Sequence, residues 1–196
     1  MRSKMARVEK MEKRGSGYLV TLSQGEEILK LNISREKTIE YGILRGSEVG
    51  EEVLDAILFE RDLTLARKKA LSILSYGDKS KKALFDKLLS SGFSEEIARL
   101  ALEYVLSYGY IDEEGQVESA VLRLATKDLH SRRYITAKLT SLGYDESLVE
   151  DVIDALVSDG VIDFAQIGDA LAEKMGATGE EKRALLYKRG FVEEDF

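Results

Sequence analysis

Two aspartates occupy equivalent places in a repeated stretch of the sequence. Asp112 ends the stretch LSYGYID at residues 106–112, and Asp163 ends the stretch VSDGVID at residues 157–163. Two carboxylates can act as general acid and general base, so both are candidates for catalysis. Each also stands where a helix is expected to begin, and aspartate is among the best N-cap residues. Gln166 adds capping-box spacing after Asp163, so we favour capping over catalysis.

His130 is the only histidine and the remaining candidate for a catalytic base. It lies among charged residues in KDLHSRRY, a context typical of an exposed helix end, and no nucleophile nearby has a recognisable motif. The sequence has no cysteine, and DEEGQVE at residues 112–118 lacks the alternating ligands of a calcium loop. We therefore predict no enzymatic activity, metal or other cofactor. A hydrolase that uses carboxylates is a weak alternative.

The composition indicates a cytoplasmic protein with a real hydrophobic core. Of the 196 residues, 44% are hydrophobic, yet no apolar run is long enough to span a membrane. The basic start, MRSKMARVEKMEKRG, has no apolar segment of the kind that secretory signals carry. The net charge of −7 argues against a protein that coats nucleic acid over its whole surface.

The hydrophobic periodicity changes near residue 34. Residues 5–33 alternate as strands, with a turn expected at Gln24-Gly25, and predict a small antiparallel meander. Ser34 is expected to cap a short helix and Ser47 to cap a longer one. From there to the end of the sequence, apolar residues recur at helical spacing.

A repeat of about 50 residues fills the helical part of the chain. KLLSSGF at residues 87–93 matches KLTSLGY at 138–144, and a glycine and an Ile-Asp pair follow each at constant offsets. LLYKRGF at 185–191 begins a third copy, whose glycine comes 47 residues after Gly143 instead of 51. Glycines such as Gly92 and Gly109 are expected to end helices in the left-handed conformation. Each copy is predicted to be a unit of three helices.

These observations predict a mostly α protein in which tandem three-helix repeats form an elongated or curved stack after a small β-rich N-terminal segment. In the first repeat, Ser80 should cap the second helix, with Leu88 and Leu89 facing inward. In the second repeat, Leu156 and Val157 should face inward from the third helix. The predicted parts are residues 1–45 (β-meander with a short helix), 46–64 (connecting helix), 65–112 (first repeat), 113–163 (second repeat) and 164–196 (incomplete third repeat).

The sign of the charge alternates with the repeat. Residues 66–91 hold seven basic and two acidic residues, whereas residues 92–122 hold one basic and seven acidic residues. Residues 123–138 are again basic, and residues 144–173 hold nine acids and no base. In a stack this pattern would give a basic ridge and an acidic ridge, although ordinary solvated helix faces explain any single lysine equally well.

The basic ridge is the surface we predict to bind a partner. Such a ridge suits the phosphates of nucleic acid or an acidic protein groove. Tyr76, Tyr134 and Tyr187 lie near basic positions and could stack on bases, but packing explains each of them more simply. The candidate binding residues are Arg67, Lys68, Lys69, Lys81, Lys82, Arg132, Arg133 and Lys138.

The order of these segments resembles the RecX family of bacterial regulatory proteins. The resemblance covers a β-rich start, then ARKKALSILSYGDKSKKALFDKLLSSGFSEEIARLALEYVLSYGYID, HSRRYITAKLTSLGYDESLVEDVIDAL and YKRGF. It implies tandem three-helix repeats and a non-enzymatic modulator of the RecA recombinase that needs no cofactor. Family members bind in the groove of the RecA filament on single-stranded DNA and restrain its growth, ATPase activity and strand exchange.

By this resemblance, the predicted partners are the RecA filament and single-stranded DNA, bound directly or through RecA, by a monomer that is not attached to a membrane. The sequence alone leaves one alternative from another class. A helical-repeat scaffold could use the same basic ridge to bind an acidic protein without any DNA.

Overall fold

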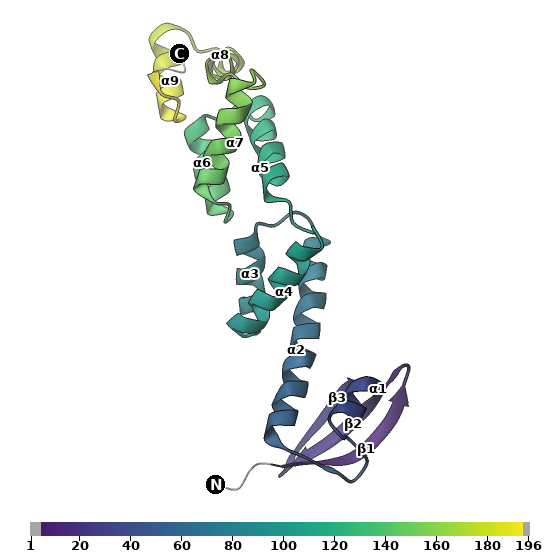
Figure 1. Cartoon of the computed structure of the whole chain (residues 1–196). Helices are drawn as coiled ribbons and strands as arrows, with labels where there is room; N and C mark the ends of the chain where they lie inside the picture. The colour runs from purple at the N-terminus through teal and green to yellow at the C-terminus, as the bar shows by residue number, and fades with distance from the viewer. Residues whose placement is uncertain (1–4, 194–196) are drawn as a thin grey trace. The chain divides into compact units, whose positions relative to one another are not determined.

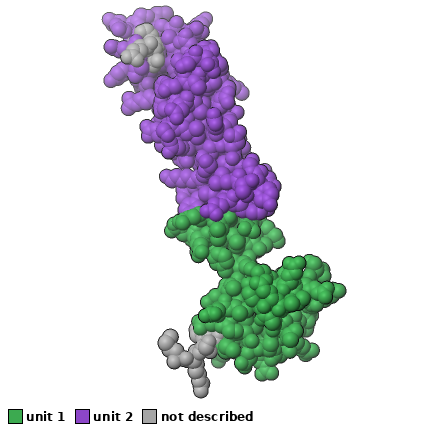
Figure 2. All heavy atoms as spheres, in the orientation of Figure 1, with its two compact units in different colours: residues 1–69, 92–101 green, residues 70–91, 102–196 purple. Residues whose placement is uncertain are grey.

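A computed structural model describes residues 5–193 and divides the chain into two compact units (Figure 1, Figure 2). Unit 1 holds the residues up to 69 together with 92–101, and unit 2 holds residues 70–91 and those from 102 onward. Helices α2 (Glu51–Leu74) and α4 (Glu95–Ser107) each begin in unit 1 and end in unit 2.

Unit 1 contains the small antiparallel sheet that the alternating pattern predicts. Its strand order is β3-β2-β1-β4, and β1 carries a bulge between Val8 and Lys10. Gln24 still pairs with Glu27, so the hairpin turn lies one residue later than expected, at Gly25 and Glu26. The strands are β1 (Ala6–Arg14), β2 (Gly17–Gln24), β3 (Glu27–Ser34) and β4 (Glu48–Val49).

One face of this sheet is buried because apolar residues alternate along each strand. The core of unit 1 combines that face with the connection after α1 (Arg35–Glu40) and the first turns of α2. Ser34 caps α1 as predicted, accepting the N–H of Lys37 at 3.2 Å. The buried core residues are Ala6, Val8, Val20, Leu22, Leu31, Ile33, Ile43, Val49, Leu54 and Ile57.

The predicted cap at Ser47 is wrong. The Ser47 hydroxyl donates to the carbonyl of Leu44 at 2.7 Å, and the two residues that follow it pair with β1 as strand β4. Helix α2 begins only at Glu51 and runs without interruption to Leu74. The predicted boundary between residues 64 and 65 therefore falls inside one helix, because no glycine or proline occurs between residues 51 and 74 to end it.

Unit 2 is helical, and the tandem helical repeats that the sequence predicts are confirmed (Figure 1). Helix α5 continues into a π-helical turn, η1, after which Leu129 takes a positive φ of 56° and leads the chain into α6. The elements are α3 (Lys81–Ser90), α5 (Glu113–Leu122), η1 (Arg123–Lys127), α6 (Arg132–Ser141), α7 (Glu146–Ser158), α8 (Phe164–Met175) and α9 (Gly179–Lys188).

A single hydrophobic core joins the second and third repeats in unit 2. Two inward positions predicted from helical spacing are wrong, since Leu89 is 37% exposed and Val157 is 40% exposed. Each directly follows a residue that is buried, and consecutive helix positions point about 100° apart. The core includes Val117, Val121, Ile135, Leu139, Val149, Ile153, Leu171, Leu186 and Phe191.

The two repeated aspartates, Asp112 and Asp163, are helix caps. Asp112 accepts the N–H of Gly115 at 3.1 Å and begins α5. Asp163 accepts the N–H of Ala165 at 2.9 Å, and the Gln166 side chain donates back to the carboxylate at 3.0 Å. The capping interpretation is therefore confirmed for both residues. Their carboxylates satisfy backbone groups at helix starts, which is a structural role.

Candidate functional site

Two buried serines join each repeat in unit 2 to the next one. The hydroxyl of Ser80, at the start of α3, donates to the carbonyl of Leu142 at 2.8 Å, at the end of α6. The hydroxyl of Ser131, at the start of α6, donates to the carbonyl of Arg189 at 2.9 Å, at the end of α9. Each serine also accepts a backbone N–H from its own helix. One hydroxyl therefore caps one helix and anchors the end of another, and we call each arrangement a serine joint.

A glycine makes each serine joint possible. Gly143 has a φ of +90°, and a Cβ there would lie 2.7 Å from the Ser80 hydroxyl and 3.3 Å from the Cβ of Lys82. Gly190 has a φ of +84°, and its Cβ would lie 3.0 Å from the Ser131 hydroxyl. A side chain at either glycine would be strained and would push the serine away. The repeated glycine therefore serves both as a helix end and as a contact between repeats.

Two basic residues follow the serine of the first joint, and they differ in their surroundings. The Lys81 side chain forms an ion pair with Glu113 at 3.0 Å, and Glu113 also accepts the backbone N–H of Lys81 at 2.7 Å. Lys82 is exposed and, within residues 5–193, no ion pair is recorded for it. Lys81 thus helps to hold α5 against the start of α3, and Lys82 is open to solvent.

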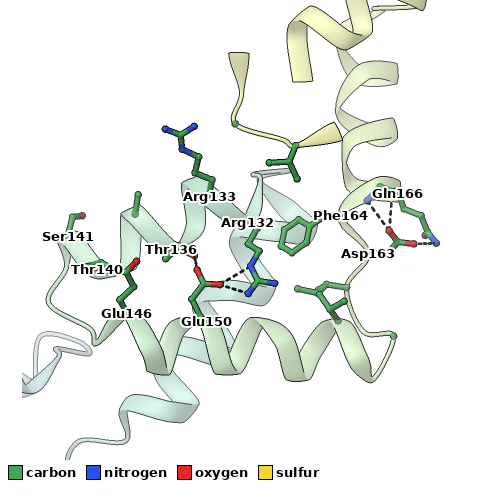
Figure 3. A pocket seen from close by; sticks show the side chains of 17 residues that line it. Arg132, Arg133, Thr136, Thr140, Ser141, Glu146, Glu150, Asp163, Phe164 and Gln166 are labelled. Atoms are coloured by element: carbon green, nitrogen blue, oxygen red, sulfur yellow. Dashed lines mark hydrogen bonds and ion pairs between the residues drawn. The ribbon is translucent and has the colours of Figure 1, made fainter. Parts of the chain in front are cut away.

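At the second serine joint, two arginines likewise follow the serine, the first of them paired and the second exposed. Arg132 reaches from α6 to α7, where it bonds Glu150 (Figure 3). It also contacts Asp154 at 2.6 Å. The bonds from Asp154 and then Glu150 raise the pKa of the guanidinium, and Arg132 in turn lowers the pKa of the Asp154 carboxyl. Arg132 is therefore fixed as a structural bridge between the second and third helices of its repeat.

Arg133 is exposed and points away from Glu150 (Figure 3). It lies at the rim of a groove of about 1210 Å³ between α6, α7 and the start of α8. In the part of the chain that the structure describes, no ion pair is recorded for its guanidinium. Arg133 and Lys82 thus occupy the same place in successive repeats, each exposed directly after a paired basic residue.

The other predicted binding residues lie on two helices. Lys68 and Lys69 are exposed on α2, and Arg67 beside them is half-buried, all three within unit 1. Lys138 is exposed on α6 in unit 2, five residues after Arg133. The structure therefore brings Arg132, Arg133 and Lys138 together on one helix, with Lys81 and Lys82 at the matching helix of the preceding repeat.

Sequence reasoning missed the role of the serines and an aromatic pair. Ser80 was expected only as a cap, and Ser131 lies 51 residues later, a spacing that identifies it as the matching residue. The rings of His130 and Tyr134 are stacked, with centroids 3.9 Å apart and planes inclined by 17°. His130 is half-buried, so it is not the solvated residue that its charged neighbours suggest.

Neither a metal centre nor a membrane span is found among residues 5–193. No group of histidine and acidic side chains there could hold a metal ion. No helix in the same range is long and apolar enough to cross a membrane. The exposed basic side chains of α3 and α6 can make ionic and hydrogen-bonding contacts.

Comparison with known proteins points to one family. Residues 66–104 match the model of the first three-helix domain of RecX. Regulatory protein RecX of Clostridioides difficile is 28% identical over 127 residues, covering 65% of this chain and 59% of the relative. Regulatory protein RecX of Streptococcus uberis is 22% identical over 176 residues, covering 90% of this chain and 65% of the relative.

The chain is thus similar to RecX proteins over most of its length. A crystal structure of regulatory protein RecX superposes with a TM-score of 0.69 at 20% identity and covers 97% of this chain and 96% of that one. RecX from Lactobacillus salivarius gives a TM-score of 0.57 at 19% identity over 68% of this chain. These structures share the fold. The alignments span about three fifths of the length of the curated RecX relatives.

Proposed function

We propose that this chain is a non-enzymatic regulator that binds the RecA filament on single-stranded DNA. It acts as a monomer in the cytoplasm and lowers the ATPase activity, filament growth and strand exchange of RecA. The observation that carries this proposal is the match of residues 66–104 to the first three-helix domain of RecX. The relatives named above are themselves called regulatory proteins, which supports a regulatory role rather than catalysis.

The exposed basic side chains of the second helices support a surface that meets the filament. Lys82 and Arg133 stand at equivalent places in two repeats, and each serine joint fixes the start of the helix that carries them. A filament on DNA presents phosphates and acidic protein surface, to which cations at a regular spacing are complementary. Lys138 adds exposed charge to this proposed surface in unit 2, and Lys68 and Lys69 offer exposed charge of their own in unit 1.

The DNA-dependent ATPase activity of RecA tests the proposal. We expect the full chain to lower the rate of ATP hydrolysis by RecA on single-stranded DNA as its concentration approaches that of RecA. The absence of any effect over a broad concentration range would contradict the proposed function. If the chain binds an acidic protein but does not change the ATPase activity of RecA, the alternative function as a helical-repeat scaffold would be favoured instead.

Charge reversal locates the surface within this assay. The double variant Lys82→Glu/Arg133→Glu should need a higher concentration than the unchanged protein for the same inhibition. Arg45→Glu is the matched control, because Arg45 is an exposed arginine in unit 1 outside the repeats. Equal inhibition by the double variant and the control would place the binding surface elsewhere.

A further inference from the structure

The stacked pair of His130 and Tyr134 lies next to the second serine joint. The backbone N–H of Tyr134 donates to the capping hydroxyl of Ser131, and the Tyr134 side chain is 43% exposed. His130 covers the ring from one side, at a centroid separation of 3.9 Å and an inclination of 17°. The backbone N–H of His130 donates to the carbonyl of Leu124 at 3.0 Å, so the histidine is held against the π-helical turn. The two rings form a rigid, partly exposed aromatic surface.

Positive charge surrounds this aromatic surface on more than one element. Arg123 from η1 and Arg189 from the end of α9 both act electrostatically on His130. Among residues 5–193, Asp128 opposes them, and it pairs with Arg123 at 3.1 Å. The serine joint brings Arg189 to the start of α6. Lys138 lies one helical turn after Tyr134, on the same side of α6.

The setting of His130 favours its uncharged form. Burial is the main cause that lowers the pKa of His130 from its usual value of 6.5, and the two arginines act in the same direction. A neutral imidazole stacked on a phenol ring presents a flat aromatic surface without a charge, while the flanking cations repel cationic ligands. Such a site favours a ligand that combines a flat ring with negative charge.

We propose that His130 and Tyr134 form a stacking platform for an unpaired base of single-stranded DNA, with Arg189 and Lys138 contacting the adjoining phosphates. Single-stranded nucleic acid is bound in proteins by aromatic rings set in a basic groove, since every base has a face that can stack. The platform acts in the absence of RecA. It adds a direct DNA contact to the proposed function, and it can fail without affecting inhibition of RecA.

A second aromatic cluster in unit 2 shows what the platform requires. Tyr104, Tyr108 and Tyr110 lie with centroids 4.8 and 6.1 Å apart, and Tyr108 is 65% exposed. Their planes are tilted by 52° and 31°, and residues 102–118 contain five acidic and no basic residues. This cluster exposes more aromatic surface but would repel phosphates. It provides a matched control within the same unit.

Fluorescence anisotropy with labelled oligodeoxythymidine tests the platform in the absence of RecA. We expect the unchanged protein to bind this oligonucleotide more tightly than an abasic strand of the same length, and more tightly than a duplex. Tyr134→Ala should weaken binding at least about fivefold, whereas Tyr134→Phe should retain it because the ring remains. Tyr108→Ala should bind like the unchanged protein.

Three results would overturn the platform. The first is equal affinity of the unchanged protein for the abasic and the base-carrying strands, which needs no variant and is independent of any folding defect. The second is unchanged affinity in Tyr134→Ala, and the third is an equal loss in Tyr108→Ala. A change in RecA inhibition without a change in free DNA binding would concern the proposed function alone.

Discussion

The starts of α3 and α6 are built alike and yet hold their charges differently. In each, a buried serine is followed by two basic residues, of which the first is paired and the second is exposed. Lys81 meets one carboxylate on α5, whereas Arg132 bonds two carboxylates on α7. A basic run in the sequence therefore divides into charges that hold the fold together and charges that are open to solvent. Which residue is which depends on the neighbouring helix, and the charge pattern does not reveal it.

Substitution of Gly143, the glycine of the first serine joint, should have the largest effect on stability. Gly143→Ala should lower the free energy of unfolding by about 2 to 4 kcal/mol, because the new Cβ is strained at a φ of +90° and meets the Ser80 hydroxyl. Gly92→Ala is the control, since Gly92 has a φ of +91° but nothing within 4 Å of a Cβ. It should cost only about 1 to 2 kcal/mol. Equal losses in urea unfolding would show that the close contact contributes nothing.

The serines should give the next largest effect. Ser131→Ala and Ser80→Ala each remove a cap and a bond to the following repeat, and each should cost about 2 kcal/mol. Ser94→Ala removes a cap only, the bond to the N–H of Ile97, and should cost about 1 kcal/mol. Thermal or urea unfolding of the three variants measures the difference. If Ser94→Ala lowered the free energy of unfolding as much as the other two variants, the bonds from Ser80 and Ser131 to the following repeat would add nothing to stability.

Substitution of the paired basic residues should destabilise the start of α6 more than the start of α3. Arg132→Gln should destabilise the protein by about 1 kcal/mol, since it leaves Glu150 and Asp154 without their arginine. Lys81→Gln should cost less, about 0.5 kcal/mol, because a single ion pair is lost and Glu113 still accepts the backbone N–H of residue 81. Unfolding at low and high salt measures both effects. A larger loss in Lys81→Gln would reverse our ranking of the two ion pairs.

The smallest expected effect is on the pH dependence of stability. The pKa of His130 is lower in the folded protein than its usual 6.5, mainly through burial. Below about pH 6.5 the unfolded chain therefore binds more protons, and stability falls as the pH is lowered through that range. His130→Gln should flatten the fall between about pH 7.5 and 5.5, where no other side chain type ordinarily titrates. An unchanged slope in unfolding experiments would contradict the sign of this shift.

The sequence predicts most of the fold because its signals are local. The alternation in residues 5–33 marks the sheet, and glycines at constant offsets mark the repeat. Asp112 and Asp163 were recognised as caps because capping depends on residues within one turn. Ser47 was assigned wrongly because pairing of the next residues with β1 is a distant contact that outweighs a local cap signal.

The candidate site could be predicted only in outline. Charge alternation identified the basic helices, but the partners of Lys81 and Arg132 come from helices 18 to 32 residues away. The stacking of His130 on Tyr134 also depends on the π-helical turn and on Leu129, and no sequence pattern predicts the positive φ of Leu129. Side-chain pairing across helices is a property of packing, which composition and periodicity do not specify.

Binding to the RecA filament, measured by titration with salt, tests whether Lys82 and Arg133 belong to the surface that meets the filament. The double variant Lys82→Glu/Arg133→Glu should bind more weakly than the unchanged protein and with a shallower salt dependence. Lys81→Gln/Arg132→Gln, which alters the paired residues, should retain more of the affinity wherever it stays folded. Affinity equal to that of the unchanged protein in Lys82→Glu/Arg133→Glu would contradict the account.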